Sequence, residues 1–349
     1  MSISRIGWIK LKQALVIGLA GAFLGFIYTL GSDGFILFYP HLNGLIGGFI
    51  MGFTLTLIEI YLFPKFLMKW RFVPLLSIRV LTYLITLTVI MLLVLNISRS
   101  QRMNTDFLTA LTSVESIDYM LYEDFKYVEF YAFIIALVFN FIRLFSIKLG
   151  YGILADFILG RYAKPKIVNR VFCFINITKA QDILINKTVT FYHQYINDIL
   201  IDITRPIIEN NGFIYEYVDD QVVIYWKSLS GWERNFRSFL SDLKKAINGR
   251  KKYYLEKYDH HPDLKFAFHE GEVVQGEIGE IKTEIVFQGD TLNTTARIIE
   301  IASSDNVLFS ESIYNITKNS LEDNKIKSLG RVYLKGKEDP INIYSFAQD

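Results

Sequence analysis

The chain has 349 residues, a usual length for two domains, and its charges are unevenly distributed. Residues 1–150 contain 12 Lys and Arg and 8 Asp and Glu, whereas residues 151–349 contain 25 and 27. This asymmetry excludes both a uniform globular chain and a disordered one, and the net charge of +2 argues against bulk binding of nucleic acid. The single cysteine, Cys173, excludes a disulfide framework and a cysteine-based zinc site.

The first half is predicted to lie in a lipid bilayer. Charged residues are absent from three long runs: 13–32, 34–58 and 80–98. A fourth run, 127–147, carries only Glu129 and Arg143. Each run can cross about 30 Å of hydrocarbon at about 1.5 Å per residue. We therefore predict an all-α membrane domain over 1–148, with four transmembrane helices near 12–31, 42–63, 74–97 and 127–148. A cleaved signal peptide is disfavoured for the first run because it is long and three more follow.

The distribution of Lys and Arg predicts the orientation of these helices. Basic residues precede the first helix and join the second to the third: Arg5, Lys10, Lys12, Lys65, Lys69 and Arg71. The loop 33–41 has no Lys or Arg, and the loop 98–126 holds more acidic than basic residues. The positive-inside rule then predicts a multi-pass protein of the inner (plasma) membrane with both termini in the cytoplasm.

Two ionisable residues lie near the inner ends of the second and third helices. Glu59 and Arg79 could pair across the helical hairpin, or both could extend to the lipid headgroups. We favour the second arrangement, because long side chains near helix ends commonly reach the interface.

A connecting segment, 149–167, links the two halves. Residues 144–162 repeat apolar side chains at helical spacing, and Pro165 is expected to end the helix. The apolar stripe predicts either a parallel coiled coil that dimerises the next domain or a helix packed on its own domain.

The second half alternates strand and helix patterns. We predict strands at 171–177, 213–218, 222–226, 264–278, 283–288, 306–309, 329–334 and 341–346. Helices are predicted at 181–210, 231–249 and 290–303. The turn Asp219-Asp220-Gln221 joins two of these strands as a hairpin. Together these elements predict an α+β domain with helices on an antiparallel-rich sheet.

Three motifs in this half resemble the catalytic domain of class III adenylyl/guanylyl cyclases. They are FHEGEVVQGEIG at 268–279, FQGDTLNTTAR at 287–297 and LKGK at 334–337, in the order and spacing of that family. The preceding GRYAKP at 160–165 resembles the linker of membrane-anchored bacterial members. The resemblance covers essentially all of 168–346, and we assign 168–349 to this domain. It implies a ferredoxin-like core, a substrate of ATP or GTP, and a homodimer whose active sites lie between two catalytic domains.

The resemblance also implies two divalent ions, Mg²⁺ or Mn²⁺, held by two aspartates. The second matches Asp220, but the first falls on Asn176, whose amide can offer oxygen to the metal but no charge. The backbone after the first position, at Ile177 and Thr178, would face the triphosphate, although Lys179 stands where glycine is common. Asp219 likewise replaces a hairpin glycine.

Other positions keep the family pattern. Asn293 and Arg297, four apart on one helix face, match the pair that orients the ribose and binds the α-phosphate. Lys335 and Lys337 resemble the late lysines that reach the phosphates, and the sequence does not choose between them.

The two positions that match those reading the nucleotide base in this family do not indicate the same base. Glu216 would accept hydrogen bonds from guanine, whereas Val286 can neither accept nor donate one. We expect an adenylate cyclase that converts ATP to cyclic AMP and pyrophosphate. The alternatives are a guanylate cyclase and a catalytically silent regulatory module, the latter suggested by Asn176, Lys179 and Asp219 together.

Overall fold

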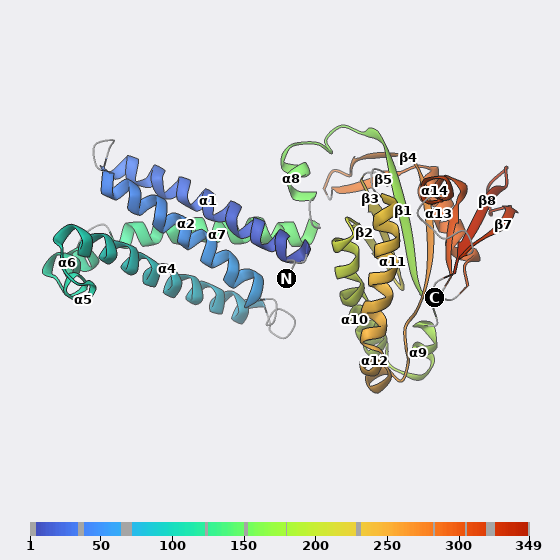
Figure 1. Ribbon diagram of the computed structural model, residues 1–349, viewed down its shortest axis with the longest axis horizontal. Helices are drawn as coiled ribbons and strands as arrows, with labels where there is room; N and C mark the ends of the chain where they lie inside the picture. Colours follow the sequence, from blue (N-terminus) through green and yellow to red (C-terminus); the bar gives the residue numbers. More distant parts are fainter. Residues whose placement is uncertain are drawn as a thin grey trace. The chain divides into compact units, whose positions relative to one another are not determined.

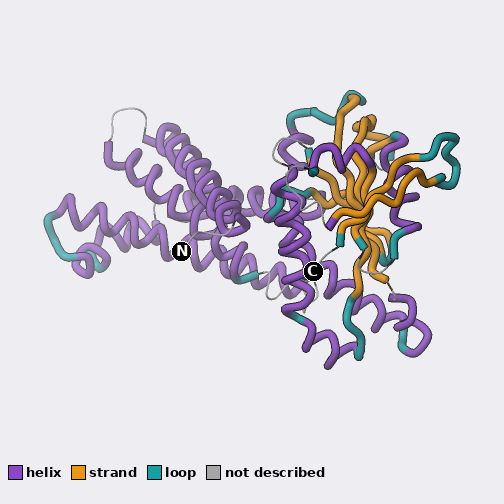
Figure 2. The backbone as a smooth tube through the Cα atoms, turned by 45° about the vertical axis from the view of Figure 1, so that its right-hand side comes forward, coloured by secondary structure: helices purple, strands orange, loops and turns teal. Residues whose placement is uncertain are grey.

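The chain forms two compact units, Met1–Phe145 and Ser146–Asp349, in a computed structural model (Figure 1). The structure describes residues 5–33, 38–63, 72–122, 125–149, 153–178, 180–227, 232–281, 283–303, 306–318 and 325–347. Lys65, Lys69, Arg71 and Lys179 lie outside the described residues. In the described residues the first unit is helical, and the strands belong to the second (Figure 2).

Among its described residues, the first unit has four long helices and two short ones. They are α1 (Arg5–Asp33), α2 (Phe38–Tyr61), α4 (Phe72–Met103), α5 (Phe107–Leu111), α6 (Val114–Tyr122) and α7 (Phe125–Leu149). In the part of the chain that the structure describes, three segments are long and apolar enough to cross a membrane: Ile6–Gly31, Phe38–Tyr61 and Ser77–Met103. The fourth predicted span corresponds to α7, and its crossing of the bilayer stays a prediction.

Glycines bring α1 and α2 into direct backbone contact. A Cβ added at Gly25 would overlap the carbonyl oxygen of Gly44, and one added at Gly48 would overlap that of Gly21. Helices in lipid associate through such close approaches because the solvent around them is as apolar as their side chains. The spacing of four residues between Gly21 and Gly25, and between Gly44 and Gly48, keeps each pair on one helix face.

The predicted extension of Glu59 and Arg79 to the headgroups is wrong in this structure. Arg79 Nε lies 3.5 Å from Glu59 Oε1, and the two side chains are only 5% and 8% exposed. The Tyr83 hydroxyl also donates to Glu59, and the Arg79 guanidinium lies 5.1 Å from the centre of the Phe63 ring. Each charge lowers the cost of removing the other from water. Glu59 and Arg79 therefore pair inside the helical unit and do not extend to the headgroups.

The connecting segment also differs from the prediction. We expected a helix from 144 to 162, but α8 (Ile153–Ile158) ends earlier and is followed by a turn. Gly160 adopts φ +65, a left-handed conformation that interrupts a right-handed helix and that glycine adopts without steric cost. Pro165 therefore does not set the end of this helix.

The second unit is built on one mixed sheet with strand order β2-β3-β1-β4-β6-β8-β7, and β5 pairs with β4. The strands are β1 (Lys166–Thr178), β2 (Phe213–Val218), β3 (Gln221–Trp226), β4 (Asp263–Ile278), β5 (Glu284–Gln288), β6 (Val307–Ser310), β7 (Ile326–Val332) and β8 (Ile341–Phe346). Among the pairs between described strands, β4 with β6 is parallel and the others are antiparallel. This confirms the predicted antiparallel-rich α+β sheet.

Helices cover the two faces of the sheet unequally. The helices are α9 (Ala180–Asn186), α10 (Val189–Glu209), α11 (Trp232–Gly249), α12 (Lys251–Tyr258), α13 (Asp290–Ile301) and α14 (Glu311–Thr317). Val171, Cys173 and Ile175 of β1 face a large core with α10 and α11, which run side by side (Figure 1). Phe172 and Phe174 face a smaller core that α13 covers. The helix predicted at 181–210 is two helices, because Thr188 caps a new one by accepting a hydrogen bond from the Phe191 amide at 3.2 Å.

Candidate active site

The end of β1 meets the β2–β3 hairpin at Asn176 and Asp220. Asn176 pairs with Gln221 across the strands, and the Ile177 amide donates to the Asp220 carbonyl at 2.9 Å. This register brings the Asn176 side-chain amide to 3.2 Å from Asp220 Oδ1, to which it donates. Because side chains alternate along a strand, Asn176 shares the α13 face of the sheet with Phe172 and Phe174.

The electrostatics around Asp220 disfavour its charged form when no cation is bound. Burial raises the pKa of the Asp220 carboxyl, and the charge of Asp219 adds to this effect. Lys265 acts in the opposite direction, because it is the β4 partner of Asn176 and lowers the pKa of Asp220. Lys265 is a site residue that was not predicted from the sequence. The signal was its place between the buried Leu264 and Phe266, which turns it to the face of Asn176.

The ligand chemistry at this end fits a divalent cation only in part. Asp220, the Asn176 amide and the Ile177 carbonyl offer the oxygen atoms that Mg²⁺ and Mn²⁺ prefer. Within the described ranges, however, His, Cys, Asp and Glu form no group of three or more that could hold a metal. Thr178 does not compensate, because its hydroxyl donates to the Asp263 carbonyl at 3.1 Å.

Helix α13 carries Asn293 and Arg297 one turn apart. Asn293 is exposed, whereas Arg297 is half-buried and its Nη1 lies 2.6 Å from Glu300 Oε1. Within the described residues, neither Asn293 nor Arg297 shares a hydrogen bond or ion pair with Asn176 or Asp220. Within one chain, the predicted metal-binding pair and the predicted Asn293–Arg297 pair therefore make no direct polar contact with each other.

The two late lysines differ in their surroundings. Lys337 donates to Asp290, the first residue of α13, and this contact lowers the pKa of the Asp290 carboxyl. Lys335 is exposed. The structure therefore connects Lys337, and not Lys335, to the helix of Asn293 and Arg297.

His269 is a neighbour of this region that the sequence analysis did not single out. Its Nδ1 lies 2.8 Å from the Ser310 hydroxyl. Burial lowers the pKa of His269 to about 4, and the charge of Lys337 contributes to the shift. The imidazole is therefore neutral near pH 7.

The two predicted base-reading positions lie on strands that touch. Glu216 is exposed on β2 and Val286 is half-buried on β5. Their chain neighbours meet, because the Phe287 amide donates to the Tyr215 hydroxyl at 3.3 Å and the two rings are 5.1 Å apart.

Comparison with known proteins decides the family. Residues 242–348 match the family model described as the adenylate and guanylate cyclase catalytic domain. The second unit contains a class III nucleotide cyclase catalytic domain. A curated relative, adenylate cyclase 2 of Rhizobium meliloti (strain 1021), is 29% identical over 155 residues. That alignment covers 43% of this chain and 42% of the relative, so it spans less than half of that protein's length.

Two solved structures share the cyclase fold. Both are described as a bacterial light-regulated adenylyl cyclase. One has a TM-score of 0.52 at 16% identity and covers 64% of this chain and 66% of the other. The second has a TM-score of 0.50 at 18% identity, with coverages of 62% and 64%. At such identities the similarity shows the fold alone. The predicted family and the predicted cyclase fold are both confirmed.

Proposed function

We propose that the chain is a membrane-anchored adenylate cyclase that converts ATP to cyclic AMP and pyrophosphate for intracellular signalling. The observation that carries this proposal is the accessible Asn293–Arg297 pair on α13. The ribose 3′-oxygen attacks the α-phosphorus, its proton passes to solvent water, and the bond from the α-phosphorus to the bridging oxygen of the departing pyrophosphate breaks. Negative charge grows on the phosphate oxygens, where a guanidinium stabilises it most effectively. Arg297 takes that role, and Asn293 orients the ribose.

Two copies of the chain would complete each site. Asn176 and Asp220 form one group and Asn293, Arg297 and Lys337 another, with no hydrogen bond between them in the described part of one chain. A two-fold homodimer would present the first group of each chain to the second group of its partner, giving two equivalent sites. Residues 1–148 would anchor the dimer in the bilayer, 149–167 would connect, and 168–349 would catalyse.

The metal-binding end predicts weak native activity. Asp220, the Asn176 oxygen and the Ile177 carbonyl would hold the divalent ion that neutralises charge on the triphosphate. One carboxylate is a weak ligand set for two cations. We therefore expect Mn²⁺ to support more activity than Mg²⁺, since Mg²⁺ demands near-ideal octahedral geometry and gives up its water ligands reluctantly.

Two observations bear on the choice between ATP and GTP. The curated relative is an adenylate cyclase, but Glu216 is exposed and free to accept from guanine N–H groups. Guanylate cyclase activity is therefore the alternative within the same chemistry.

The alternative without catalysis is a silent regulatory module. Its supporting observation is the hydrogen bond from Asn176 to Asp220, which satisfies an oxygen of the carboxylate without a metal. Such a module would still bind a nucleotide or a partner but would release no product.

Product analysis distinguishes these functions. The full chain, purified in phospholipid nanodiscs, is incubated with ATP or GTP and with Mg²⁺ or Mn²⁺, and the products are identified by mass spectrometry. We expect slow formation of cyclic AMP, faster with Mn²⁺. Asn176→Asp should raise the rate at least tenfold, because it restores a charged ligand.

Asp220→Ala is the matched control, and it should abolish product in both backgrounds. If neither the natural chain nor Asn176→Asp yields a cyclic nucleotide under any condition, the chain is not a cyclase and the regulatory module takes its place. If the only product is cyclic GMP, the alternative base choice is correct.

A further inference from the structure

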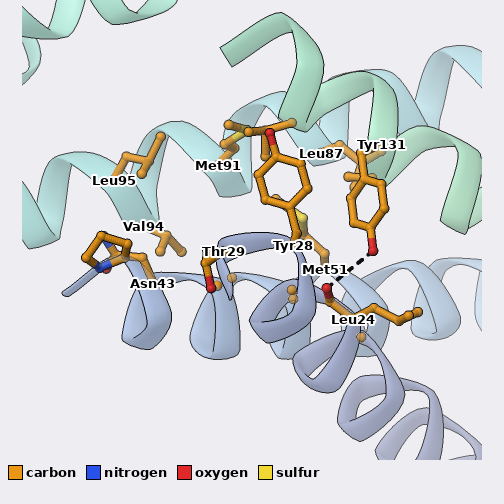
Figure 3. A pocket seen from close by; sticks show the side chains of 18 of the residues that line it. Leu24, Tyr28, Thr29, Asn43, Met51, Leu87, Met91, Val94, Leu95 and Tyr131 are labelled. Atoms are coloured by element: carbon orange, nitrogen blue, oxygen red, sulfur yellow. Dashed lines mark hydrogen bonds between the residues drawn. The ribbon is translucent and has the colours of Figure 1, made fainter. Parts of the chain in front are cut away.

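A cavity of about 310 Å³ lies inside the first unit, among α1, α2, α4 and α7. Its walls are largely apolar, and Figure 3 shows Leu87, Met91 and Val94 of α4 turned toward the same space as Tyr28 of α1. Tyr131 of α7 closes one side and donates to the Leu24 carbonyl at 3.3 Å. A cavity of this size is at the lower end of those that bind small molecules.

Glycine keeps this space open. Gly47 of α2 lies in the cavity wall, and a Cβ added there would meet only Val94, at 3.7 Å. Any larger side chain at this position would therefore enter the cavity. The neighbouring Gly48 also lines it, but a Cβ there would overlap the α1 backbone.

Two arginines line one end of the cavity, near the start of α2 and the end of α4. The Arg102 guanidinium lies 6.0 Å from the centre of the Tyr39 ring, and Arg99 donates to the Ser116 hydroxyl of α6. Among the residues with described side chains, neither arginine forms an ion pair. Asn43 also lines the cavity (Figure 3).

The cavity is also elongated. Leu87 and Arg99 both line it and are twelve residues apart on α4, about 18 Å at 1.5 Å per residue. The site thus combines a long apolar body with two uncompensated cations at one end.

We propose that this cavity binds an amphipathic anion: an apolar chain whose anionic oxygen head lies against Arg99 and Arg102. The planar guanidinium fork matches a pair of anionic oxygens, and the Arg99 contact with Ser116 holds that fork in place. The apolar walls take the chain, whose burial stabilises the complex. Two sources carry this chemistry, a free fatty acid and an acidic phospholipid.

Dodecanoate is a suitable probe. Binding of radiolabelled dodecanoate is measured for the full chain in phosphatidylcholine nanodiscs, with empty nanodiscs subtracted. We expect saturable binding of about one probe per chain, because this cavity is at the lower end of the size range of small-molecule sites. Dodecanol, which has the same chain without the charge, should bind at least tenfold more weakly.

Two variants test the site, each with a matched control. Arg99→Gln should weaken dodecanoate binding about tenfold or more, whereas Lys12→Gln removes an exposed charge of α1 outside the cavity and should change it less than twofold. Gly47→Leu should weaken binding as strongly by filling the space. Gly31→Leu adds the same side chain where a Cβ meets nothing within 4 Å, and it should bind normally.

Three results would overturn the proposal: binding that does not saturate, equal binding of dodecanol, or unchanged binding in both Arg99→Gln and Gly47→Leu. If Gly47→Leu does not fold, Gly47→Ala provides a smaller intrusion and Arg102→Gln a second charge test. Nanodiscs containing phosphatidylglycerol distinguish the sources. Competition by that lipid identifies a phospholipid site, and undiminished dodecanoate binding identifies a free-acid site. These readouts do not depend on catalysis.

Discussion

Two lysines that are distant in the chain contact or influence residues of the candidate site. Asn176 and Asp220 themselves are brought into hydrogen-bond contact by a strand and the nearby hairpin, an arrangement that the local sequence predicts. The influence of Lys265 could not be predicted in the same way. It depends on the register of β1 against β4, strands that are more than 80 residues apart in the chain. The Lys337–Asp290 contact likewise joins residues 47 positions apart.

Arg297 should act on turnover far more than on substrate affinity. Its guanidinium would meet charge that develops only as the α-phosphorus is attacked. Arg297→Ala should lower kcat by about 100-fold or more and leave KM within about threefold, measured in whichever of the natural or Asn176→Asp chains gives the higher rate.

Glu300→Ala is the control for that change. It removes the ion pair with Arg297 at 2.6 Å and leaves the guanidinium in place. We expect kcat to stay within a few-fold of the parent, because an exposed pair contributes little. An unchanged kcat in Arg297→Ala would remove this residue from the catalytic group.

His269 should make the stability of the cyclase domain depend on acid. The folded chain takes up this proton with a pKa of about 4, whereas the ordinary value is 6.5. Between these values the unfolded chain binds more protons, so the free energy of unfolding falls as the pH falls from 6.5 to 4. The shift corresponds to about 3 kcal/mol.

Denaturant unfolding of the purified chain, followed by tryptophan fluorescence at several pH values, measures this effect. In His269→Gln the loss between pH 6.5 and 4 should be smaller by that amount. His193→Gln changes an exposed histidine and should keep the dependence of the parent chain. Identical pH profiles for His269→Gln and the parent would contradict the assignment.

At the scale of elements, short-range signals predicted the strands well and the helix ends less well. Each predicted strand from 171–177 to 341–346 has a counterpart, because turn residues and alternating burial are local properties. The break at Thr188 depends on one capping hydrogen bond, and the chain leaves the helical conformation after α8 at the left-handed Gly160. Neither feature changes the apolar periodicity from which the helices were predicted. Helix α12 was not predicted; its buried Tyr254 and Tyr258 lie in a charged segment whose apolar face is formed only by tertiary packing.

Two adjacent glycines of α2 should respond in opposite ways to the same change. Gly48→Ala forces a methyl group into the α1 backbone and should cost about 1–3 kcal/mol or more. Gly47→Ala meets only Val94 at 3.7 Å, and alanine favours the helix, so it should be neutral or stabilising. The thermal midpoints of the two variants in detergent, compared with the parent, give the measurement. Equal loss in both would show that the contact between α1 and α2 does not limit stability.

At the scale of the whole molecule, α7 decides where the cyclase domain lies. Three candidate spans would leave residues 5 and 153 on opposite sides of the bilayer, whereas a fourth returns the chain to the side on which it began. The Lys and Arg distribution predicts four spans and a cytoplasmic cyclase domain. A reporter that is active only outside the cytoplasm, fused after Asp349, should be silent, and the same reporter inserted near Asp118 should be active. A strong signal after Asp349 would contradict the crossing by α7.

The proposed sharing of the active site between two chains makes a quantitative prediction for mixed dimers. If each site combines Asp220 of one chain with Arg297 of the other, Asp220→Ala and Arg297→Ala each disable both sites of their own homodimer. A mixed dimer of the two variants places both defects in one site and leaves the other intact. Random pairing at equal amounts makes about half of the dimers mixed, each with one working site, so about a quarter of the parent activity should return.

The measurement is cyclic nucleotide production by co-expressed, differently tagged chains, in the Asn176→Asp background if that background is the more active. Asp220→Ala paired with Asn176→Ala provides the control, because both changes affect the same half of the site and no dimer of these two regains a complete one. Full inactivity of the Asp220→Ala and Arg297→Ala mixture, with mixed dimers present by tag purification, would show that one chain builds its site alone. Arg297 would then have to reach Asp220 within its own domain, which needs its guanidinium to leave Glu300, its partner on the same helix.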